Sequence, residues 1–175
     1  NQPTPLTISN QSFNVNCYGD STGYAYIQVN GGVSPYNYSW SNGASTDSIY
    51  NLALGTFIVS VTDANGCSKS AIFGLQCPPV MEVNLIAKSN FNGCNVSCPE
   101  SEDGEAVATI LNGNPPYSYE WSSGATDISA NNLTAGINSL IVTDDNGCSV
   151  TAFVELTAPA EMELIPTGLS NYEGF

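Results

Sequence analysis

The chain consists of one module written twice, and this duplication constrains its fold more than any other feature. Residues 17–78 align with residues 98–159 at a constant offset, without a gap, and 25 of these 62 positions are identical. A third copy begins near Pro159 and stops at Phe175. Chains that repeat a structural unit grow by addition, so the sequence favours a stalk or fibre over a protein built around one active site.

The repeat predicts how the chain is divided. We expect one domain at residues 1–78, a second at residues 79–158, and an opening strand or assembly tail at residues 159–175. Two domains of this size can each bury a core. Hydrophobic residues make up 42% of the chain, which indicates folded domains rather than disorder.

The charge of the chain excludes several classes of partner and reaction. Sixteen acidic residues stand against two basic ones, giving a net charge of −14, and histidine is absent. Nucleic acid and anionic membranes require basic residues, so we expect neither as a partner. No apolar run reaches the roughly 20 residues of a membrane-spanning helix, so we expect no membrane insertion. Without histidine the common catalytic bases and triads are missing, so we predict that the chain is not an enzyme and has no catalytic residues.

The cysteines predict disulfide bonds and an oxidising, extracellular location. Four of them occupy equivalent positions in the two copies: Cys17, Cys67, Cys98 and Cys148. The other two, Cys77 and Cys94, have no cysteine counterpart in the alignment of the copies. The simplest pairing is one bridge within each copy, Cys17–Cys67 and Cys98–Cys148, with a Cys77–Cys94 clip near the junction. Other connectivities remain open, because six cysteines can pair in many ways.

Alternation of apolar and polar residues with period two predicts short β-strands. The inward set of the first copy is Ala25, Ile27, Val29, Tyr36, Tyr38, Trp40, Val59, Val61, Ala71, Phe73 and Leu75. The second copy repeats it at Ala106, Ala108, Ile110, Tyr117, Tyr119, Trp121, Leu140, Val142, Ala152, Val154 and Leu156. Opening strands are predicted at residues 6–8 and 81–86. Short strands separated by frequent turns predict an all-β fold of two tandem immunoglobulin-like antiparallel β-sandwich domains, with Trp40 and Trp121 in their cores.

Three motifs recur in each copy. The first copy reads Gly-Gly-Val-Ser-Pro-Tyr-Asn-Tyr-Ser-Trp-Ser-Asn-Gly at 31–43, Asn-Leu-Ala-Leu-Gly at 51–55 and Val-Thr-Asp-Ala-Asn-Gly-Cys at 61–67. The second reads Gly-Asn-Pro-Pro-Tyr-Ser-Tyr-Glu-Trp-Ser-Ser-Gly at 113–124, Asn-Leu-Thr-Ala-Gly at 132–136 and Val-Thr-Asp-Asp-Asn-Gly-Cys at 142–148. Together these motifs resemble the SprB repeat family. The resemblance implies secreted surface proteins of Bacteroidota that serve adhesion or gliding motility, with repeats acting as spacers or filament units.

We therefore expect an extracellular structural or adhesive protein on a bacterial surface, forming a rigid, disulfide-clipped stalk or filament segment. Its expected partners are copies of itself or further repeats of the same parent chain. The alternative is a carbohydrate- or ligand-binding module that contacts surface glycans through a strip of tyrosines: Tyr24, Tyr26, Tyr36, Tyr38 and Tyr50. Tyr24 and Tyr26 become Glu105 and Val107 in the second copy, so this strip is not a property of the module.

Two further kinds of site are suggested by local sequence. Four carboxylates crowd the loop after Cys98 and could bind calcium, the one cofactor that the sequence suggests: Glu100, Glu102, Asp103 and Glu105. The alternative is a solvated acidic loop, because the first copy offers only Asp20 there. Ser21 and Ser48 lie in Asp-Ser-Thr and Asp-Ser-Ile sequences, which are similar to the O-glycosylation signal of the same bacterial group.

The end of the chain repeats the beginning of the second copy. Met162-Glu163 matches Met81-Glu82, and no complete module follows it. We predict an assembly strand at Glu161, Met162, Glu163, Leu164 and Ile165. An unpaired strand exposes backbone donors and acceptors, so it could join the sheet edge of a neighbouring molecule and build a polymer.

Overall fold

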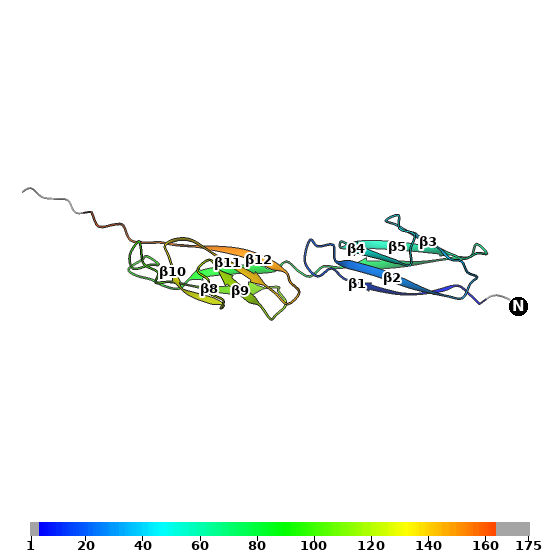
Figure 1. Cartoon of the computed structure of the whole chain (residues 1–175), viewed down its shortest axis with the longest axis horizontal. Helices are drawn as coiled ribbons and strands as arrows, with labels where there is room; N and C mark the ends of the chain where they lie inside the picture. The colour runs from blue at the N-terminus through cyan, green and yellow to red at the C-terminus, as the bar shows by residue number, and fades with distance from the viewer. Residues whose placement is uncertain (1–3, 164–175) are drawn as a thin grey trace, which may run out of the picture. The chain divides into compact units, whose positions relative to one another are not determined.

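A computed structural model describes residues 4–163, and this part of the chain is built from β-strands without a helix. The first copy contains β1 (Thr7–Phe13), β2 (Gly23–Asn30), β3 (Asn37–Trp40), β4 (Ser48–Leu52), β5 (Gly55–Thr62) and β6 (Ser68–Leu75). The second copy contains β7 (Glu82–Ala87), β8 (Gly104–Leu111), β9 (Ser118–Trp121), β10 (Ser129–Leu133), β11 (Gly136–Thr143) and β12 (Ser149–Leu156), and the strands can be followed in Figure 1. Accordingly, the described residues include no helix capable of crossing a membrane.

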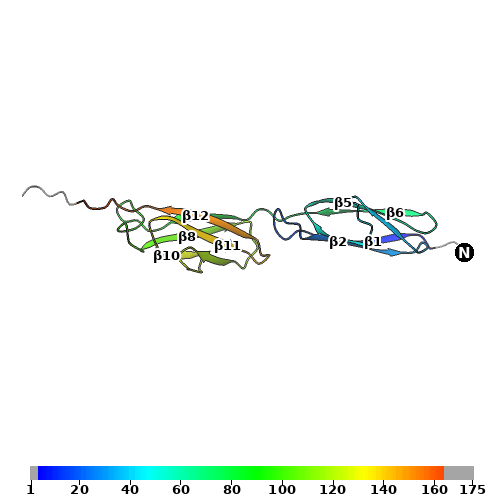
Figure 2. The ribbon, with the colours of Figure 1, turned by 45° about the horizontal axis from the view of Figure 1, so that its top comes forward.

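Two three-stranded sheets form the first copy. One sheet has the order β1-β2-β4 and the other has the order β3-β5-β6. The register is antiparallel, with Tyr38 opposite Val61 and Phe57 opposite Phe73. Figure 2 shows the two layers, with β5 and β6 above β1 and β2. Two packed antiparallel sheets whose strands exchange sheets along the chain are an immunoglobulin-like sandwich, which confirms the predicted fold class.

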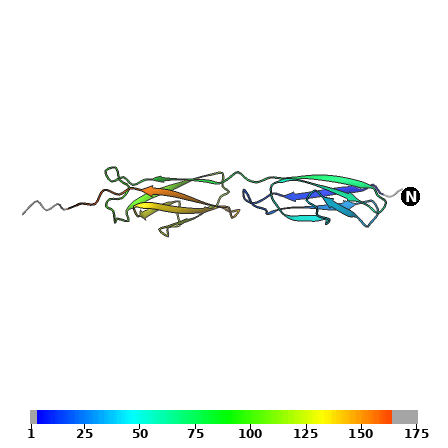
Figure 3. The same cartoon turned by 90° about the horizontal axis from the view of Figure 1, so that it is seen from above.

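The second copy repeats this arrangement strand for strand. Its sheets have the orders β7-β8-β10 and β9-β11-β12, and its strands are drawn in green to orange in Figure 3. Each of its strands from β8 to β12 begins at the position that the sequence alignment pairs with the start of its counterpart. The repeated inward faces predicted from the sequence therefore produce the same strands twice.

Inward side chains fill the core of the first copy. Its buried members are Ala25, Ile27, Trp40, Ile49, Leu52, Val59, Val61, Phe73 and Leu75. Trp40 is 3% exposed, and its ring centre lies 5.2 Å from that of Phe73. Its indole N–H donates a hydrogen bond of 2.7 Å to the carbonyl oxygen of Thr46. Trp121 is buried likewise and donates to the carbonyl oxygen of Asp127 at 2.9 Å.

The opening strands of the two copies do not follow the offset that relates the later strands. Phe13 lies opposite Tyr24, and the backbone amide of Lys88 donates at 2.8 Å to the carbonyl oxygen of Glu105, the counterpart of Tyr24. Lys88 therefore takes the place of Phe13, whereas the constant offset would pair Phe13 with Cys94. The second copy has additional residues after its opening strand, and Cys94 is one of them, which explains why this cysteine has no cysteine counterpart.

Backbone contacts divide the chain into two compact units. Unit 1 contains the residues up to 82 together with segments 110–117 and 143–150. Unit 2 contains residues 83–109, residues 118–142 and the chain from residue 151 onward. The predicted domains at 1–78 and 79–158 follow the sequence copies, whereas unit 1 also includes two segments of the second copy.

Candidate functional site

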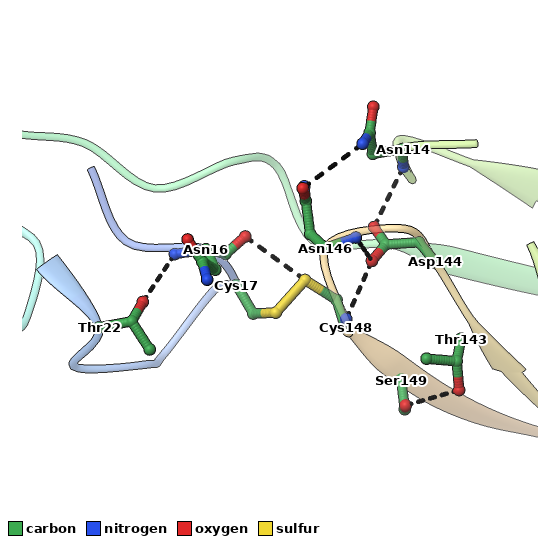
Figure 4. Close-up of a disulfide and its surroundings, with 9 residues drawn as sticks. All are labelled: Asn16, Cys17, Thr22, Asn114, Thr143, Asp144, Asn146, Cys148 and Ser149. Atoms are coloured by element: carbon green, nitrogen blue, oxygen red, sulfur yellow. Dashed lines mark hydrogen bonds between the residues drawn. A yellow bond between two sulfur atoms is a disulfide. The ribbon is translucent and has the colours of Figure 1, made fainter. Parts of the chain in front are cut away.

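The described residues contain one disulfide, which joins Cys17 to Cys148 within unit 1 (Figure 4). The Cα atoms of these residues are 5.5 Å apart, and the two cysteines are separated by 131 residues in the sequence. The predicted pairs Cys17–Cys67 and Cys98–Cys148 are therefore wrong. Because each copy carries one cysteine of each kind, the repeat is equally compatible with pairing within a copy and with pairing across copies.

Cys67 is held by an aspartate turn at the end of β5. Oδ1 of Asp63 accepts hydrogen bonds from the backbone amides of Asn65 at 3.0 Å and Cys67 at 2.8 Å. Oδ2 accepts a third bond, of 3.0 Å, from the amide of Val33. Asp63 is buried. Its carboxylate fixes the turn that carries the cysteine and connects this turn to the loop between β2 and β3, which contains Val33.

The same turn holds Cys148 in the second copy. Oδ1 of Asp144 accepts from the amides of Asn146 at 3.0 Å and Cys148 at 2.9 Å, as Figure 4 shows. Its Oδ2 accepts from the amide of Asn114 at 3.1 Å. Every one of these bonds has its counterpart around Asp63, so the two copies present this cysteine on the same backbone.

The electrostatics of Asp63 reflect two opposing effects. Burial raises the pKa of its carboxyl group, but the backbone amides that point at it, led by those of Cys67, Val33 and Asn65, favour the charged form. The amides prevail, and the pKa of Asp63 lies below its usual value. The turn is therefore built around a carboxylate rather than a carboxylic acid.

A second kind of loop carries Cys17. The backbone amide of Asn16 donates to Oγ1 of Thr22 at 2.8 Å, a bond that Figure 4 also shows. The amide of Asp20 donates to the carbonyl oxygen of Cys17 at 3.2 Å. The cysteine thus lies in a turn whose two ends are fixed before β2 begins.

Cys98 lies in the matching loop of the second copy. The amide of Ser97 donates to Oδ1 of Asp103 at 3.1 Å, and the amide of Ser101 donates to the carbonyl oxygen of Cys98 at 3.0 Å. Both bonds occupy positions equivalent to those of their counterparts around Cys17. Hydrogen bonding by Ser97 holds the pKa of Asp103 below its usual value, and the side chain of Ser97 contributes more than its backbone amide.

Four cysteines carry free thiols. Cys67 and Cys98 are exposed, and Cys77 and Cys94 are half-buried. The predicted Cys77–Cys94 clip is therefore wrong as well. Cys94 is held by its backbone instead, since its amide and carbonyl groups bond those of Phe91 in an isolated bridge.

The predicted calcium site is not formed in the described structure. Across residues 4–163, no three acidic, cysteine or histidine side chains meet in a way that could hold a metal ion. Of the four candidates, Asp103 is bound to Ser97, while Glu100, Glu102 and Glu105 are exposed. The bond from Ser97 to Asp103 fixes the residue next to Cys98, and calcium binding by this loop stays a prediction.

The two candidate glycosylation serines lie in different surroundings. Ser21 is exposed in the loop before β2. Ser48 is half-buried at the start of β4, opposite Tyr26, and its hydroxyl donates to Oδ1 of Asp47 at 3.0 Å. Glycosylation at either residue remains a prediction.

The structure brings together only part of the predicted tyrosine strip. Tyr24 stacks between Phe13, at a ring-centre distance of 4.2 Å, and Tyr50, at 5.9 Å. Tyr36 and Tyr38 pack instead against the core of the first copy. Sequence reasoning missed Phe13, which becomes part of the stack because β1 pairs with β2 and places it opposite Tyr24.

The predicted assembly strand lies partly outside the described residues. Glu161, Met162 and Glu163 are described and exposed, without regular structure, whereas Leu164 and Ile165 fall beyond residue 163. Met162 is 98% exposed, while its sequence counterpart Met81 is only 6% exposed. The methionine of the same Met-Glu sequence is thus buried at one position and exposed at the other.

Comparison with known proteins supports the family resemblance. The SprB repeat family matches residues 9–45, which include most of β1 and all of β2 and β3, and residues 92–126, which include β8 and β9. No curated protein sequence matches the chain significantly.

Two solved structures share a general likeness with the chain. One is a C-terminal 282-residue fragment of intimin in complex with the intimin-binding domain of the translocated intimin receptor, with a TM-score of 0.38 and 11% identity over 90% of this chain. The chain spans 64% of the length of that fragment. The other is the Ig1+Ig2 segment of DIP-gamma, with a TM-score of 0.35 and 11% identity over 90% of this chain and 99% of that segment.

The two family matches lie in the first part of each copy and begin before the loops that carry Cys17 and Cys98. SprB repeats are associated with the cell surface. Two regions of the chain, residues 9–45 and residues 92–126, therefore match the SprB repeat family.

Proposed function

We propose that the chain is an extracellular structural repeat protein, a stalk or filament segment on a bacterial surface that resists mechanical unfolding. The observation that carries this proposal is the Cys17–Cys148 bond, which closes most of the chain into one covalent loop. The duplicated sandwiches and the SprB matches support a role in reach and strength. Such a role requires no catalysis.

The position of the disulfide determines how the chain responds to a pulling force. A force applied to the two ends of the chain passes through the Cys17–Cys148 bond and bypasses the residues between them. An extended chain spans at most about 3.3–3.6 Å per residue. The bond therefore prevents the residues between Cys17 and Cys148 from extending by a length on the order of 450 Å. The strands from β2 to β11 lie between the two cysteines and are therefore shielded from load while the bond is intact, whereas β1 and β12 lie outside the loop.

Single-molecule force spectroscopy tests this role. Under oxidising conditions, a chain pulled by its ends should show almost no unfolding length from residues 18–147. After reduction, or in the Cys17→Ser variant, unfolding events should release on the order of 450 Å in total. Cys77→Ser, which removes a free thiol, is the matched control and should behave as the wild type. Equal extension with and without reductant would contradict the proposal.

The proposed location follows from redox chemistry and from the family. Disulfides persist in oxidising exteriors and are rare in a reducing cytosol. The SprB match points to the cell surface independently of the cysteines. Brief protease treatment of intact producing cells should remove the repeats, and their survival until lysis would contradict an exterior location.

The end of the described chain supports assembly into longer structures. Met81 packs against Gly113, where an added Cβ would lie 2.8 Å from its Sδ, and Leu6 covers Gly32 in the same way. We propose that Met162 and the following residues form the opening strand of a further module, in which Met162 becomes covered. In a second copy of this chain, the tail would replace the acceptor's own residues 6–13.

Sedimentation velocity tests this assembly step. The full chain should form concentration-dependent oligomers under reducing conditions, and a chain lacking residues 160–175 should remain a monomer. Met162→Asp should weaken assembly, because a charge would have to be buried. A full chain that stays monomeric at every concentration would exclude strand addition by the tail.

The stacked aromatic rings favour a second candidate function, carbohydrate binding. Phe13, Tyr24 and Tyr50 form a ladder on the β1-β2-β4 sheet, and Phe13 and Tyr50 are exposed. Exposed rings offer apolar faces on which sugars can stack. A glycan array should show binding that the Tyr50→Ala variant loses and the Tyr18→Ala variant keeps. An array without any binding would contradict carbohydrate binding and leave the structural role as the proposed function.

A further inference from the structure

The Cys17–Cys148 bond joins two different kinds of cysteine loop. Cys17 and Cys98 are counterparts, and so are Cys67 and Cys148, because each pair occupies equivalent positions in the two copies. The observed bond uses the first kind from one copy and the second kind from the other. One cysteine of each kind is left over, Cys98 and Cys67, and both are exposed free thiols.

The unused loops have the same construction as the bonded ones. The carboxylate of Asp63 bonds the amide of Cys67 at 2.8 Å, and that of Asp144 bonds the amide of Cys148 at 2.9 Å. The turns after Cys17 and Cys98 are closed by the same backbone bond, at 3.2 and 3.0 Å. Each free thiol is therefore presented on a backbone that is known to support this bond.

We propose that Cys98 of one chain forms this same disulfide with Cys67 of a second copy of the chain. The pairing is between unlike loops, so it leaves one loop of each kind free on every dimer. A contact between unlike surfaces that does not close on itself generates an open chain. The product is a covalent head-to-tail polymer in which every junction repeats the Cys17–Cys148 connection. This inference rests on the proposed structural function and adds its partner and its linkage.

The bond requires an oxidant, and we assign this part to a small disulfide such as oxidised glutathione. The Cys98 thiolate attacks one sulfur of the small disulfide, forms a mixed disulfide and expels one thiolate. The Cys67 thiolate of the second chain then attacks Sγ of Cys98 and expels the Cys98-bound thiol group as a second thiolate. Two protein thiols lose two electrons and two protons, and one small disulfide becomes two thiols.

Both exposure and the repeat distinguish Cys67 and Cys98 from the other free cysteines. Cys77 and Cys94 are also free, yet neither has a cysteine counterpart and neither lies in one of the two matched loops. A Cys77→Ser/Cys94→Ser double variant therefore removes the other free thiols and leaves the proposed linkage intact. This double variant is the background in which the linkage is tested.

The test uses complementary variants of the full chain, oxidised with glutathione disulfide and separated on a non-reducing gel. The background chain should form a ladder of polymers. Adding Cys67→Ser or Cys98→Ser should each abolish all species above the monomer. Mixing these two variants should restore a dimer and nothing larger, because each supplies one half of a single bond. Peptide mapping of the dimer should find Cys67 joined to Cys98.

Three results would overturn the proposal. They are dimers of either single variant by itself, a mixture that yields no dimer, and a background chain that stays monomeric although its Cys17–Cys148 bond has formed. Mapping that bond in every variant shows that the chain has folded. The force measurement on single chains does not depend on polymerisation, so failure of the linkage and failure of the structural function can be told apart.

Discussion

The backbone amide of Cys67 donates a hydrogen bond of 2.8 Å to the carboxylate of Asp63, which precedes it in the same turn. Asp144 and Cys148 reproduce this bond at 2.9 Å in the second copy. The Asp-x-Asn-Gly-Cys sequence therefore forms a turn that holds a cysteine in a fixed position, and the aspartate stabilises this turn by accepting backbone hydrogen bonds. This relationship explains why the motif occurs in both copies although only one of the two cysteines is bonded.

Replacing Asp63 with asparagine should lower the thermal unfolding temperature at neutral pH, because the charge-assisted bonds to Cys67, Asn65 and Val33 are weakened. The pKa of Asp63 is depressed in the folded state, so its stabilisation is present above the unfolded pKa of about 3.9 and is lost as the pH falls through the folded pKa. Asp63→Asn should therefore lose less stability on acidification than the wild type. Circular dichroism melts across this range measure the difference.

The control for this prediction is Asp145→Asn in the corresponding turn of the second copy. Asp145 is exposed, and the contacts that fix its turn are made by Asp144 instead. This variant should melt as the wild type does at neutral pH. Parallel pH profiles for Asp63→Asn and the wild type would show that the Asp63 carboxylate does not carry the effect.

Removing the disulfide should destabilise the chain substantially. In the chain-entropy model, a bond that closes a loop of this length stabilises the folded state by about 5 kcal/mol, because it restricts the unfolded chain. Cys17→Ser should show this loss in calorimetric unfolding, and reduction of the wild type should reproduce it. Cys98→Ser removes an exposed free thiol and should change stability little. Equal stability of Cys17→Ser and Cys98→Ser would refute a structural role of the bond.

Gly23 is required by close packing rather than by an unusual backbone angle. A Cβ at this position would lie 2.9 Å from the carbonyl oxygen of Leu52 and 3.0 Å from Cδ1 of Leu75. Gly23→Ala should therefore cost about 1–3 kcal/mol, as overpacked cores do. Gly74 is a matched control in β6, because a Cβ there would meet open space, so Gly74→Ala should be neutral or slightly stabilising. Denaturant titrations of both variants compare them directly.

Trp40 should be among the most costly residues of the first copy to truncate. It is 3% exposed and contacts Phe73, so Trp40→Ala should cost about 3–5 kcal/mol. Ile72 neighbours Phe73 in the same strand but is 67% exposed, and Ile72→Ala should change stability by less than about 0.5 kcal/mol. Chemical unfolding followed by circular dichroism distinguishes the two. Similar costs for both variants would show that the inward face has been assigned wrongly.

Period-two alternation predicted most strands, because an apolar residue at every second position determines which face of the strand is buried in the core. It missed β4 and β10. In each of these strands an asparagine adopts a positive φ, 55° at Asn51 and 67° at Asn132. The register along the neighbouring strand shifts at these places, so two exposed residues separate the buried ones and the alternation is broken. A period-two pattern cannot reveal a strand whose own geometry interrupts it.

The candidate site was harder to predict than the fold for a different reason. The constant offset between the copies identifies which cysteines are equivalent, but it does not identify which cysteines meet. Cys17 with Cys67 and Cys17 with Cys148 satisfy the same repeat, and only the folded arrangement distinguishes them. The predicted calcium cluster is not gathered in the fold because neighbouring acids in a loop are not a site unless the backbone turns them toward one point.

Disulfide mapping of the non-reduced chain by proteolysis and mass spectrometry tests the central claim most directly. The account predicts a linked pair of peptides that contain Cys17 and Cys148 and that separate on reduction. Peptides linking Cys17 to Cys67, or Cys98 to Cys148, would contradict it, because they would show that the disulfides form within each copy.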